Sequence, residues 1–298
     1  MRWRPRPDWK LVPRPTAPSR GLTGRRRFAI IASIVAALLV SLGGAAVAGV
    51  FGNAPQQRGT GQAARGLTAV PRGSGNSGKT VRPAAGSAAT AGAGRTSCAS
   101  VAHIGDSTSV GMVSPQWLAD PAQRLAAQYR DVGVRHTWIN ASGGRSIVEE
   151  MPNQRNGYLV ASAWYQQGFR GCWVFALGTN DTANVAVGSN VGLMARIHEM
   201  MSAAHGEPVM WVNTQTDLSS GPWSEANMQA WNKTLVAACS AYPNMRIFNW
   251  AAMVRPTWHL ADGIHYTSAG YAIRAHAIAR ALARAFPAGG RSSGCLVS

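Results

Sequence analysis

The sequence predicts an α/β fold in which a five-stranded parallel sheet is covered by helices on both faces. From Cys98 onward, short runs of β-branched or aromatic residues alternate with longer amphipathic stretches. Strands that alternate with helices are typical of a parallel sheet with helices on both sides. This alternating part is about 200 residues long, which suits a single domain.

Five runs are predicted to form the strands. They are "SVAHI" (100–104), "VRHTWIN" (134–140), "CWVFAL" (172–177), "PVMWVNT" (208–214) and "NMRIFNW" (244–250). Amphipathic or helix-favouring stretches predict helices at 191–204, 225–239 and 268–285. The order of these elements supports one folded domain over residues 98–298.

The net charge of +17 is concentrated in the first third of the chain. Residues 1–94 contain 14 Lys and Arg against one acidic residue, and residues 95–298 contain 15 against 11. The two parts therefore carry +13 and +4, which sum to +17. A nucleic-acid-binding domain would carry its basic residues on a folded face. We therefore expect no nucleic-acid partner.

The first 52 residues are predicted to anchor the chain in a membrane. Residues 1–27 would be a basic cytoplasmic tail with nine Lys or Arg. The uncharged run 28–52 is long enough to cross a bilayer core, which takes about 20 apolar residues. The positive-inside rule then places the catalytic part outside the cytoplasm. The alternative is a signal peptide cleaved after Ala46-Val47-Ala48 and a secreted protein, which the length of the apolar run disfavours.

Residues 53–97 are predicted to be a disordered linker. They consist mainly of Gly, Ala, Ser, Thr, Pro and Arg, so they cannot bury enough apolar surface to offset the entropy of ordering. Within them, "GSGNSGKT" matches the phosphate-binding pattern G-x-x-x-x-G-K-[ST] at Gly73, Gly78, Lys79 and Thr80. A working loop of this kind needs a strand before it and a helix after it, but a proline stands on each side of the match. We therefore expect no nucleotide to bind here.

Four polar clusters follow the predicted strands. They are "GDS" (105–107), "NASGGRS" (140–146), "GTND" (178–181) and "DGIH" (262–265). Active sites in open parallel sheets gather at the carboxyl ends of the strands. We therefore expect all four clusters to meet at one edge of the sheet.

The residue types in these clusters indicate acyl transfer through a serine nucleophile. Ser107 stands where a strand turns into a helix, and a serine hydroxyl needs an adjacent base, usually histidine. His265 is the candidate base, and Asp262 can hold its ring by accepting the other ring N–H. The oxyanion that forms needs preorganised donors. The candidates are the N–H groups of Ser107 and Gly144 and the side-chain amide of Asn180.

The four clusters resemble those of the SGNH (GDSL-type) hydrolases, and the resemblance covers residues 98–287. It implies a three-layer α/β/α sandwich and gives Ser107, Gly144, Asn180, Asp262 and His265 the roles stated above. The "IGDS", "GGRS", "GTN" and "VNT" stretches are similar to those of the extracytoplasmic SGNH domains of peptidoglycan O-acetyltransferases and other acyltransferase-3-linked proteins. Those proteins usually carry a multi-helix membrane domain that supplies the acyl donor. If this chain transfers acyl groups, the resemblance implies a separate membrane protein as donor.

Two glycines in "NASGGRS" could supply the oxyanion donor, and Gly144 matches the family's "GR" pattern better than Gly143. Five further residues near the expected edge are candidates for substrate binding: Arg145, Asp181, Trp223, Trp258 and His259. Each also has a structural interpretation. Arg145 could form a salt bridge, Asp181 could cap a helix, and the three ring residues could be core or loop residues.

Four cysteines in an exported domain predict disulfides, and four allow three pairings. In the fold that the resemblance implies, the first and third strands are neighbours. We therefore expect Cys98 to pair with Cys172, and Cys239 with Cys295. The cysteine and histidine spacings match no metal site, and we expect neither a metal nor another cofactor.

These features together predict a membrane-anchored, extracytoplasmic serine esterase. Its substrates would be acyl esters, O-acetyl esters in particular, on envelope glycans or lipids. The first alternative is an O-acyltransferase that moves an acyl group onto a cell-wall glycan. A non-catalytic envelope-binding module is the alternative from another class.

Overall fold

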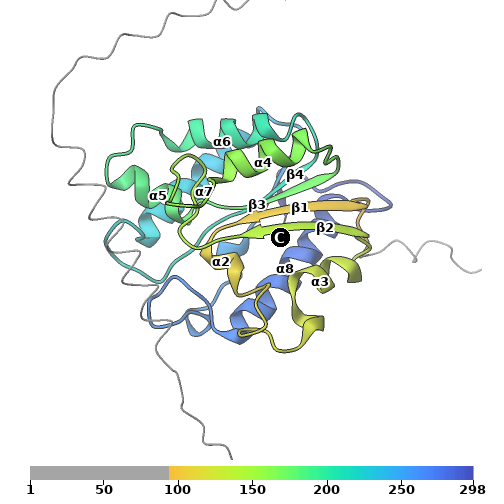
Figure 1. Ribbon diagram of the computed structural model, residues 1–298, viewed down its shortest axis with the longest axis horizontal. Coiled ribbons are helices and arrows are strands. Elements are labelled where there is room, and N and C mark those ends of the chain that lie inside the picture. Colours follow the sequence, from red (N-terminus) through yellow and green to blue (C-terminus); the bar gives the residue numbers. More distant parts are fainter. Residues whose placement is uncertain (1–93, 298) are drawn as a thin grey trace, which may run out of the picture. The chain divides into compact units, whose positions relative to one another are not determined.

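The computed structural model describes residues 94–297, which contain a six-stranded sheet (Figure 1). All strands are parallel and their order is β2-β1-β3-β4-β5-β6. Their bounds are β1 Ser100–Gly105, β2 His136–Ala141, β3 Cys172–Ala176, β4 Val209–Val212, β5 Met245–Phe248 and β6 Leu296–Val297. The α/β class, the parallel pairing and the five predicted strands are confirmed, as is the pairing of β1 with β3.

Helices cover both faces of the sheet, as predicted. The first group lies above the sheet in Figure 1 and comprises α4 Gly157–Gln166, α5 Thr179–Ala186, α6 Leu193–Ala203 and α7 Glu225–Cys239. The second group lies below it and comprises α2 Ser107–Val110, α3 Leu125–Asp131 and α8 Ser268–Ala285. Short 3-10 turns occur at Pro121–Gln123, Trp250–Ala252 and Pro256–Trp258. None of the helices within residues 94–297 has the length and apolar composition needed to cross a bilayer.

Each face of the sheet has its own hydrophobic core, because successive side chains of a strand point to opposite faces. In β3, Trp173 and Phe175 belong to the core under α4, α6 and α7, whereas Val174 belongs to the core under α3 and α8. β3 is buried along its whole length, which explains why its sequence is a continuous apolar run.

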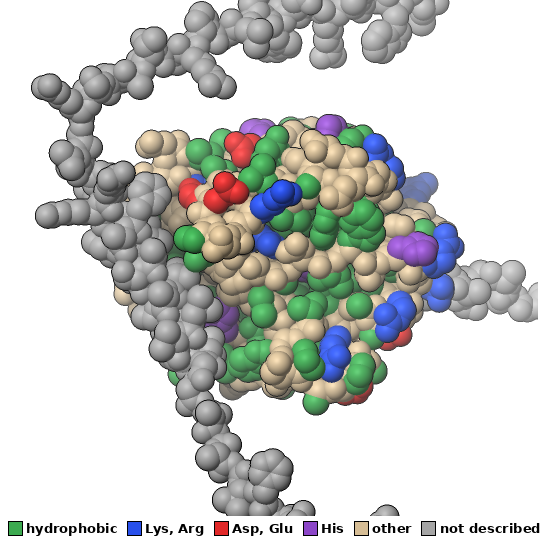
Figure 2. Space-filling model, viewed as in Figure 1, with side chains coloured by type: hydrophobic (Ala, Val, Ile, Leu, Met, Phe, Trp, Pro, Cys, Tyr) green, Lys and Arg blue, Asp and Glu red, His purple; other side chains and the backbone are tan. Residues whose placement is uncertain are grey.

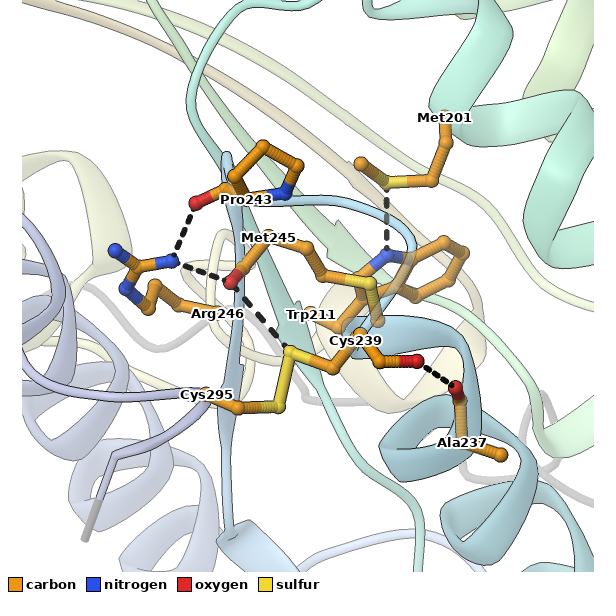
Figure 3. The surroundings of a disulfide bond; sticks show 9 residues. Met201, Trp211, Ala237, Cys239, Pro243, Met245, Arg246 and Cys295 are labelled. Atoms are coloured by element: carbon orange, nitrogen blue, oxygen red, sulfur yellow. Dashed lines mark hydrogen bonds between the residues drawn. A yellow bond between two sulfur atoms is a disulfide. The ribbon is translucent and has the colours of Figure 1, made fainter.

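The expectation of five strands is wrong by one, because β6 extends the sheet beyond β5. A two-residue strand carries no periodic signal, and the segment before it is rich in Gly and Ser. The predicted disulfide between Cys239 and Cys295 is confirmed, and it ties the end of α7 to the residue before β6 (Figure 3). The Cys239 sulfur also lies 3.6 Å from the carbonyl oxygen of Met245, where β5 begins.

The second predicted disulfide, between Cys98 and Cys172, is confirmed as well. It joins the segment before β1 to the first residue of β3. These two strands pair directly. The bond therefore closes a loop across neighbouring strands at the end where both begin.

The folded domain begins earlier than the predicted boundary at residue 98. The Thr96 N–H donates to the carbonyl of Val132, and its hydroxyl donates to the carbonyl of Phe286, 2.8 Å away in each case. The last residues assigned to the linker are therefore held between α3 and the end of α8. The predicted membrane anchor, the rest of the linker and the match at Gly73, Gly78, Lys79 and Thr80 lie outside the described residues.

Candidate active site

The ends of β1, β2 and β3 meet at one edge of the sheet, as the polar clusters predict. The Asp106 N–H donates to the carbonyl of Ala176 at the end of β3. The Ser142 N–H donates to the carbonyl of Gly105 at the end of β1. These bonds place the "GDS", "NASGGRS" and "GTND" segments next to one another.

Ser107 is the first residue of α2, directly after β1. Asp106 caps this short helix, because its carboxylate accepts from the N–H and the hydroxyl of Thr108 at 2.8 and 2.7 Å. The Ser107 side chain is half-buried. It makes no hydrogen bond within residues 94–297, and catalytic bonds of this kind often tighten only when substrate is present.

The candidate base and its partner form a direct pair. His265 Nδ1 lies 2.6 Å from one carboxylate oxygen of Asp262. The other oxygen accepts the N–H groups of Ile264 and His265, both at 2.9 Å. Burial alone would raise the pKa of Asp262, but the hydrogen bonds from His265 and Ile264 outweigh it and lower the pKa to about 2. Asp262 is therefore ionised at neutral pH and holds the proton on Nδ1.

The segments that carry Ser107 and His265 are linked through Arg274. This residue lies on α8 and donates to the hydroxyl of Thr108, the residue after Ser107, at 3.3 Å. Its guanidinium also lies 5.3 Å from the ring centroid of Tyr266, the residue after His265. Burial raises the pKa of Asp106, while its bonds to Thr108 and the charge of Arg274 oppose the increase.

Three donors remain available at this edge. Within residues 94–297, no hydrogen bond uses the N–H groups of Ser107 or Gly144. The Gly143 N–H is likewise unused, so hydrogen bonding does not decide between the two glycines. Gly144 has a φ of +69°, which a glycine adopts readily. One N–H of the Asn180 amide donates to the carbonyl of Arg145 at 3.0 Å, and the other has no partner among the described residues 94–297.

Arg145, a candidate for substrate binding or for a structural salt bridge, has a structural environment in this domain. It is 4% exposed, and its guanidinium donates to the backbone carbonyls of Gly105, Asn140 and Arg155 at 3.2, 2.8 and 3.4 Å. The side chain therefore fastens the ends of β1 and β2. It forms none of the salt bridges within residues 94–297 either.

Asp181 also lies inside the domain, where its side chain is fully buried and does not reach the surface. It accepts from the Ile147 N–H at 2.8 Å and pairs with Arg196 at 2.9 Å. Arg196 in turn forms an ion pair with Glu149. Burial raises the pKa of Asp181 to about 6 despite the Arg196 charge. For Glu149, burial would raise the pKa, but the bonds from Arg196, Ser189 and Ser146 lower it to about 2.

The three ring residues predicted to contact substrate have different surroundings. Trp223 lies at the site, where its indole N–H donates to the Asn180 carbonyl oxygen at 3.3 Å. Trp258 is half-buried and stacks on Trp250, with 5.9 Å between ring centroids. His259 is 8% exposed, and its Nε2 lies 2.7 Å from the Gln215 side-chain oxygen. The environment of His259 therefore favours its structural interpretation.

Two buried arginines were missed by the sequence analysis. Arg274 belongs to α8 and is 2% exposed, and Arg196 belongs to α6 and is fully buried. Both stand at helical spacing from apolar core residues: Arg274 lies between Tyr271 and Ile278, and Arg196 precedes Met200 by one turn. A charged residue on the apolar side of a helix was the signal that could have identified them.

Comparisons with known proteins found solved structures that are similar to this chain. The C-terminal catalytic domain of peptidoglycan O-acetyltransferase A from Streptococcus pneumoniae is 18% identical with a TM-score of 0.45, and the match covers 62% of this chain and 93% of that one. A carbohydrate acetylesterase family member from Sinorhizobium meliloti is 13% identical with a TM-score of 0.49, covering 62% and 97%. TesA is 17% identical with a TM-score of 0.45, covering 59% and 93%.

No family model and no curated protein matches the sequence. At the identities and TM-scores above, the structural likeness does not decide what this chain does. The assignment of an activity therefore depends on the residues of the site itself.

Proposed function

We propose that this protein is a serine ester hydrolase or acyltransferase of the SGNH type. The observation that carries the proposal is the Asp262–His265 pair at 2.6 Å. Ser107, which follows β1 and begins α2, is the proposed nucleophile for this base. A histidine held by an ionised carboxylate is suited to accept the proton of a serine hydroxyl. The binding-module alternative does not account for this pair.

The proposed reaction begins when Ser107 Oγ attacks the carbonyl carbon of an acyl ester. His265 Nε2 takes the hydroxyl proton, and the N–H groups of Ser107 and Gly144 with the Asn180 amide stabilise the oxyanion. The ester C–O bond then breaks, and His265 returns the proton to the departing alcohol. An acyl-Ser107 intermediate remains, and a water molecule or a sugar hydroxyl accepts the acyl group through the same base.

The substrate and location form the finer part of the proposal. The basic tail 1–27 and the apolar run 28–52 support a membrane anchor with the N-terminus inside. The two disulfides suit a catalytic domain outside the cytoplasm. Acyl esters of envelope glycans or lipids, O-acetyl esters in particular, would be within its reach. A transferase reaction would also need a separate membrane protein as acyl donor.

Labelling with a serine-directed fluorophosphonate tests the proposal. The full-length protein should react, and Ser107→Ala should not. Ser114→Ala is the matched control, because Ser114 lies after α2 and its hydroxyl bonds only to Gln116 within residues 94–297. Equal labelling of Ser107→Ala and wild type, or no labelling of either, would reject the nucleophile. Turnover of short- and long-chain esters, with and without a glycan acceptor, then distinguishes hydrolysis from transfer.

A further inference from the structure

We propose that Trp223 is a positioning residue that fixes the orientation of the Asn180 amide in the oxyanion hole. The inference rests on the proposed function, and it assigns Trp223 a role other than substrate contact. The side chain lies in the loop between β4 and α7, whereas Asn180 is in the first turn of α5. The two residues meet through one hydrogen bond of 3.3 Å.

The chemistry of the neighbours allows only one orientation of the amide. The Trp223 indole nitrogen can only donate, so it requires the Asn180 oxygen on its side. The Arg145 carbonyl can only accept, so it requires the Asn180 nitrogen on the other side. A flipped amide would bring two donors together at Trp223 and two acceptors together at Arg145. The second N–H of Asn180 is therefore held free for the oxyanion.

Trp223 is itself held firmly by its loop. Its carbonyl accepts from the Thr216 hydroxyl at 2.7 Å, and Thr216 is 1% exposed. The Thr216 N–H donates to the Glu225 carboxylate at 2.9 Å. Glu225 is the first residue of α7, and its N–H returns to the carbonyl of Leu218 at 2.8 Å. These bonds close the loop on itself, so that the indole has a defined position.

The same loop also contacts the segment that carries the base. The Asp217 N–H donates to the Gly263 carbonyl at 2.7 Å. Gly263 lies between Asp262 and His265 and has a φ of +66°. A Cβ at Gly263 would lie 3.2 Å from the Asp217 carbonyl oxygen, so the two segments approach closely. One loop thus connects the oxyanion side of the site with the acid–base side.

The variant that tests this role is Trp223→Phe, which keeps an aromatic ring and removes the N–H. We expect kcat for a short-chain aryl ester to fall about five- to tenfold, because one neutral hydrogen bond that orients the amide is lost. KM should stay within about twofold, since the ring still fills its place. Trp164→Phe is the matched control, because Trp164 is also half-buried, but it lies in α4 and packs on Trp138 instead of bonding to Asn180.

A double-mutant cycle separates positioning from substrate contact. Asn180→Ala should lose about 10²–10³ in kcat, and adding Trp223→Phe should cost almost nothing more, because the amide to be oriented is gone. Rates of fluorophosphonate labelling should follow the same pattern. Urea unfolding of each variant shows whether the domain remains folded.

Two outcomes are distinguishable. If the losses from Trp223→Phe and Asn180→Ala multiply, or if Trp223→Phe raises KM and leaves kcat unchanged, Trp223 contacts substrate and the positioning role is rejected. If wild type itself neither labels nor turns over esters, the proposed function fails first. An active wild type with multiplying losses rejects the positioning role alone.

Discussion

Asp262 binds His265 twice, once through the ring and once through the backbone. One carboxylate oxygen lies 2.6 Å from Nδ1, and the other accepts the histidine's own N–H at 2.9 Å. The carboxylate therefore fixes both the ring and the peptide from which the ring extends. Because these bonds and the one from the Ile264 N–H lower the pKa of Asp262 to about 2, the Asp262 carboxylate stays ionised across the range in which a serine hydrolase works.

Replacing this carboxylate should remove most of the activity without unfolding the protein. In Asp262→Asn, the amide can donate to Nδ1, which moves the ring proton to Nε2 and leaves no acceptor for the Ser107 hydroxyl. We expect kcat to fall by about 10²–10⁴. Ester turnover at neutral pH measures this. Asp217→Asn, an exposed carboxylate on the loop that contacts Gly263, should behave like wild type. Full activity of Asp262→Asn would show that the histidine needs no carboxylate.

Substitution of the two adjacent glycines decides which one supplies the oxyanion donor. At Gly144 an alanine would have to adopt a φ of +69°, which costs about 1–2 kcal/mol and displaces the local peptide. Gly143 is absent from the positive-φ residues of the described chain. Gly144→Ala should therefore lose more kcat than Gly143→Ala, at comparable KM. The reverse order would assign the donor to Gly143.

Because of the Glu149–Arg196 ion pair, the free energy of unfolding should depend on pH. The folded-state pKa of Glu149 is about 2, below its ordinary value of 4.5. A depressed carboxyl pKa stabilises the fold fully above about pH 4.5, and this contribution disappears as the pH falls towards 2. Glu149→Gln should thus lower the free energy of unfolding at pH 7 by about 2 kcal/mol and by much less at pH 3.

Urea unfolding at the two pH values measures the difference. Glu150→Gln is the control, because Glu150 is the exposed neighbour and forms none of the ion pairs within residues 94–297. A deficit for Glu149→Gln that is equal at pH 7 and pH 3 would contradict the role assigned to its charge.

The Cys98–Cys172 bond should stabilise the domain without affecting catalysis. It spans 74 residues. Closing a loop of that size lowers the conformational entropy of the unfolded chain and so raises the free energy of unfolding by about 4 kcal/mol. The double variant Cys98→Ser/Cys172→Ser should unfold at lower urea concentration, while kcat at 25 °C stays unchanged. Loss of activity in a protein that still gives a cooperative unfolding transition would show that the bond supports the site directly.

The sequence was sufficient to predict the sheet and the edge where the polar clusters meet, because both follow from local patterns. Strands that are buried on both sides appear as continuous apolar runs, and "CWVFAL" is such a run. Asp262 and His265 were predictable as partners because they lie three residues apart. Both disulfide pairings were predictable once the strand order was assumed.

The sequence did not reveal which side chains at that edge are buried. Arg145 and Asp181 belong to the predicted clusters, yet the first fastens strand ends and the second pairs with Arg196. The Arg145 partners lie 5, 10 and 40 residues away, and Arg196 lies 15 residues after Asp181. None of these separations is a helical or strand repeat, so the pattern of the sequence does not encode the contacts. Trp223 was a candidate for substrate binding because of its aromatic ring. In the structure, its indole N–H makes the hydrogen bond to Asn180.

Both disulfides lie where the strands begin, and the proposed chemistry lies where they end. Cys172 is the first residue of β3, and Ala176, its last residue, already borders the segment that carries Ser107. The length of β3 therefore separates the Cys98–Cys172 disulfide from the segment that carries Ser107 by about 13 Å. A change of redox conditions would thus act on the durability of the domain while sparing its turnover. Resistance to unfolding and catalytic rate can accordingly be altered independently of each other in this chain.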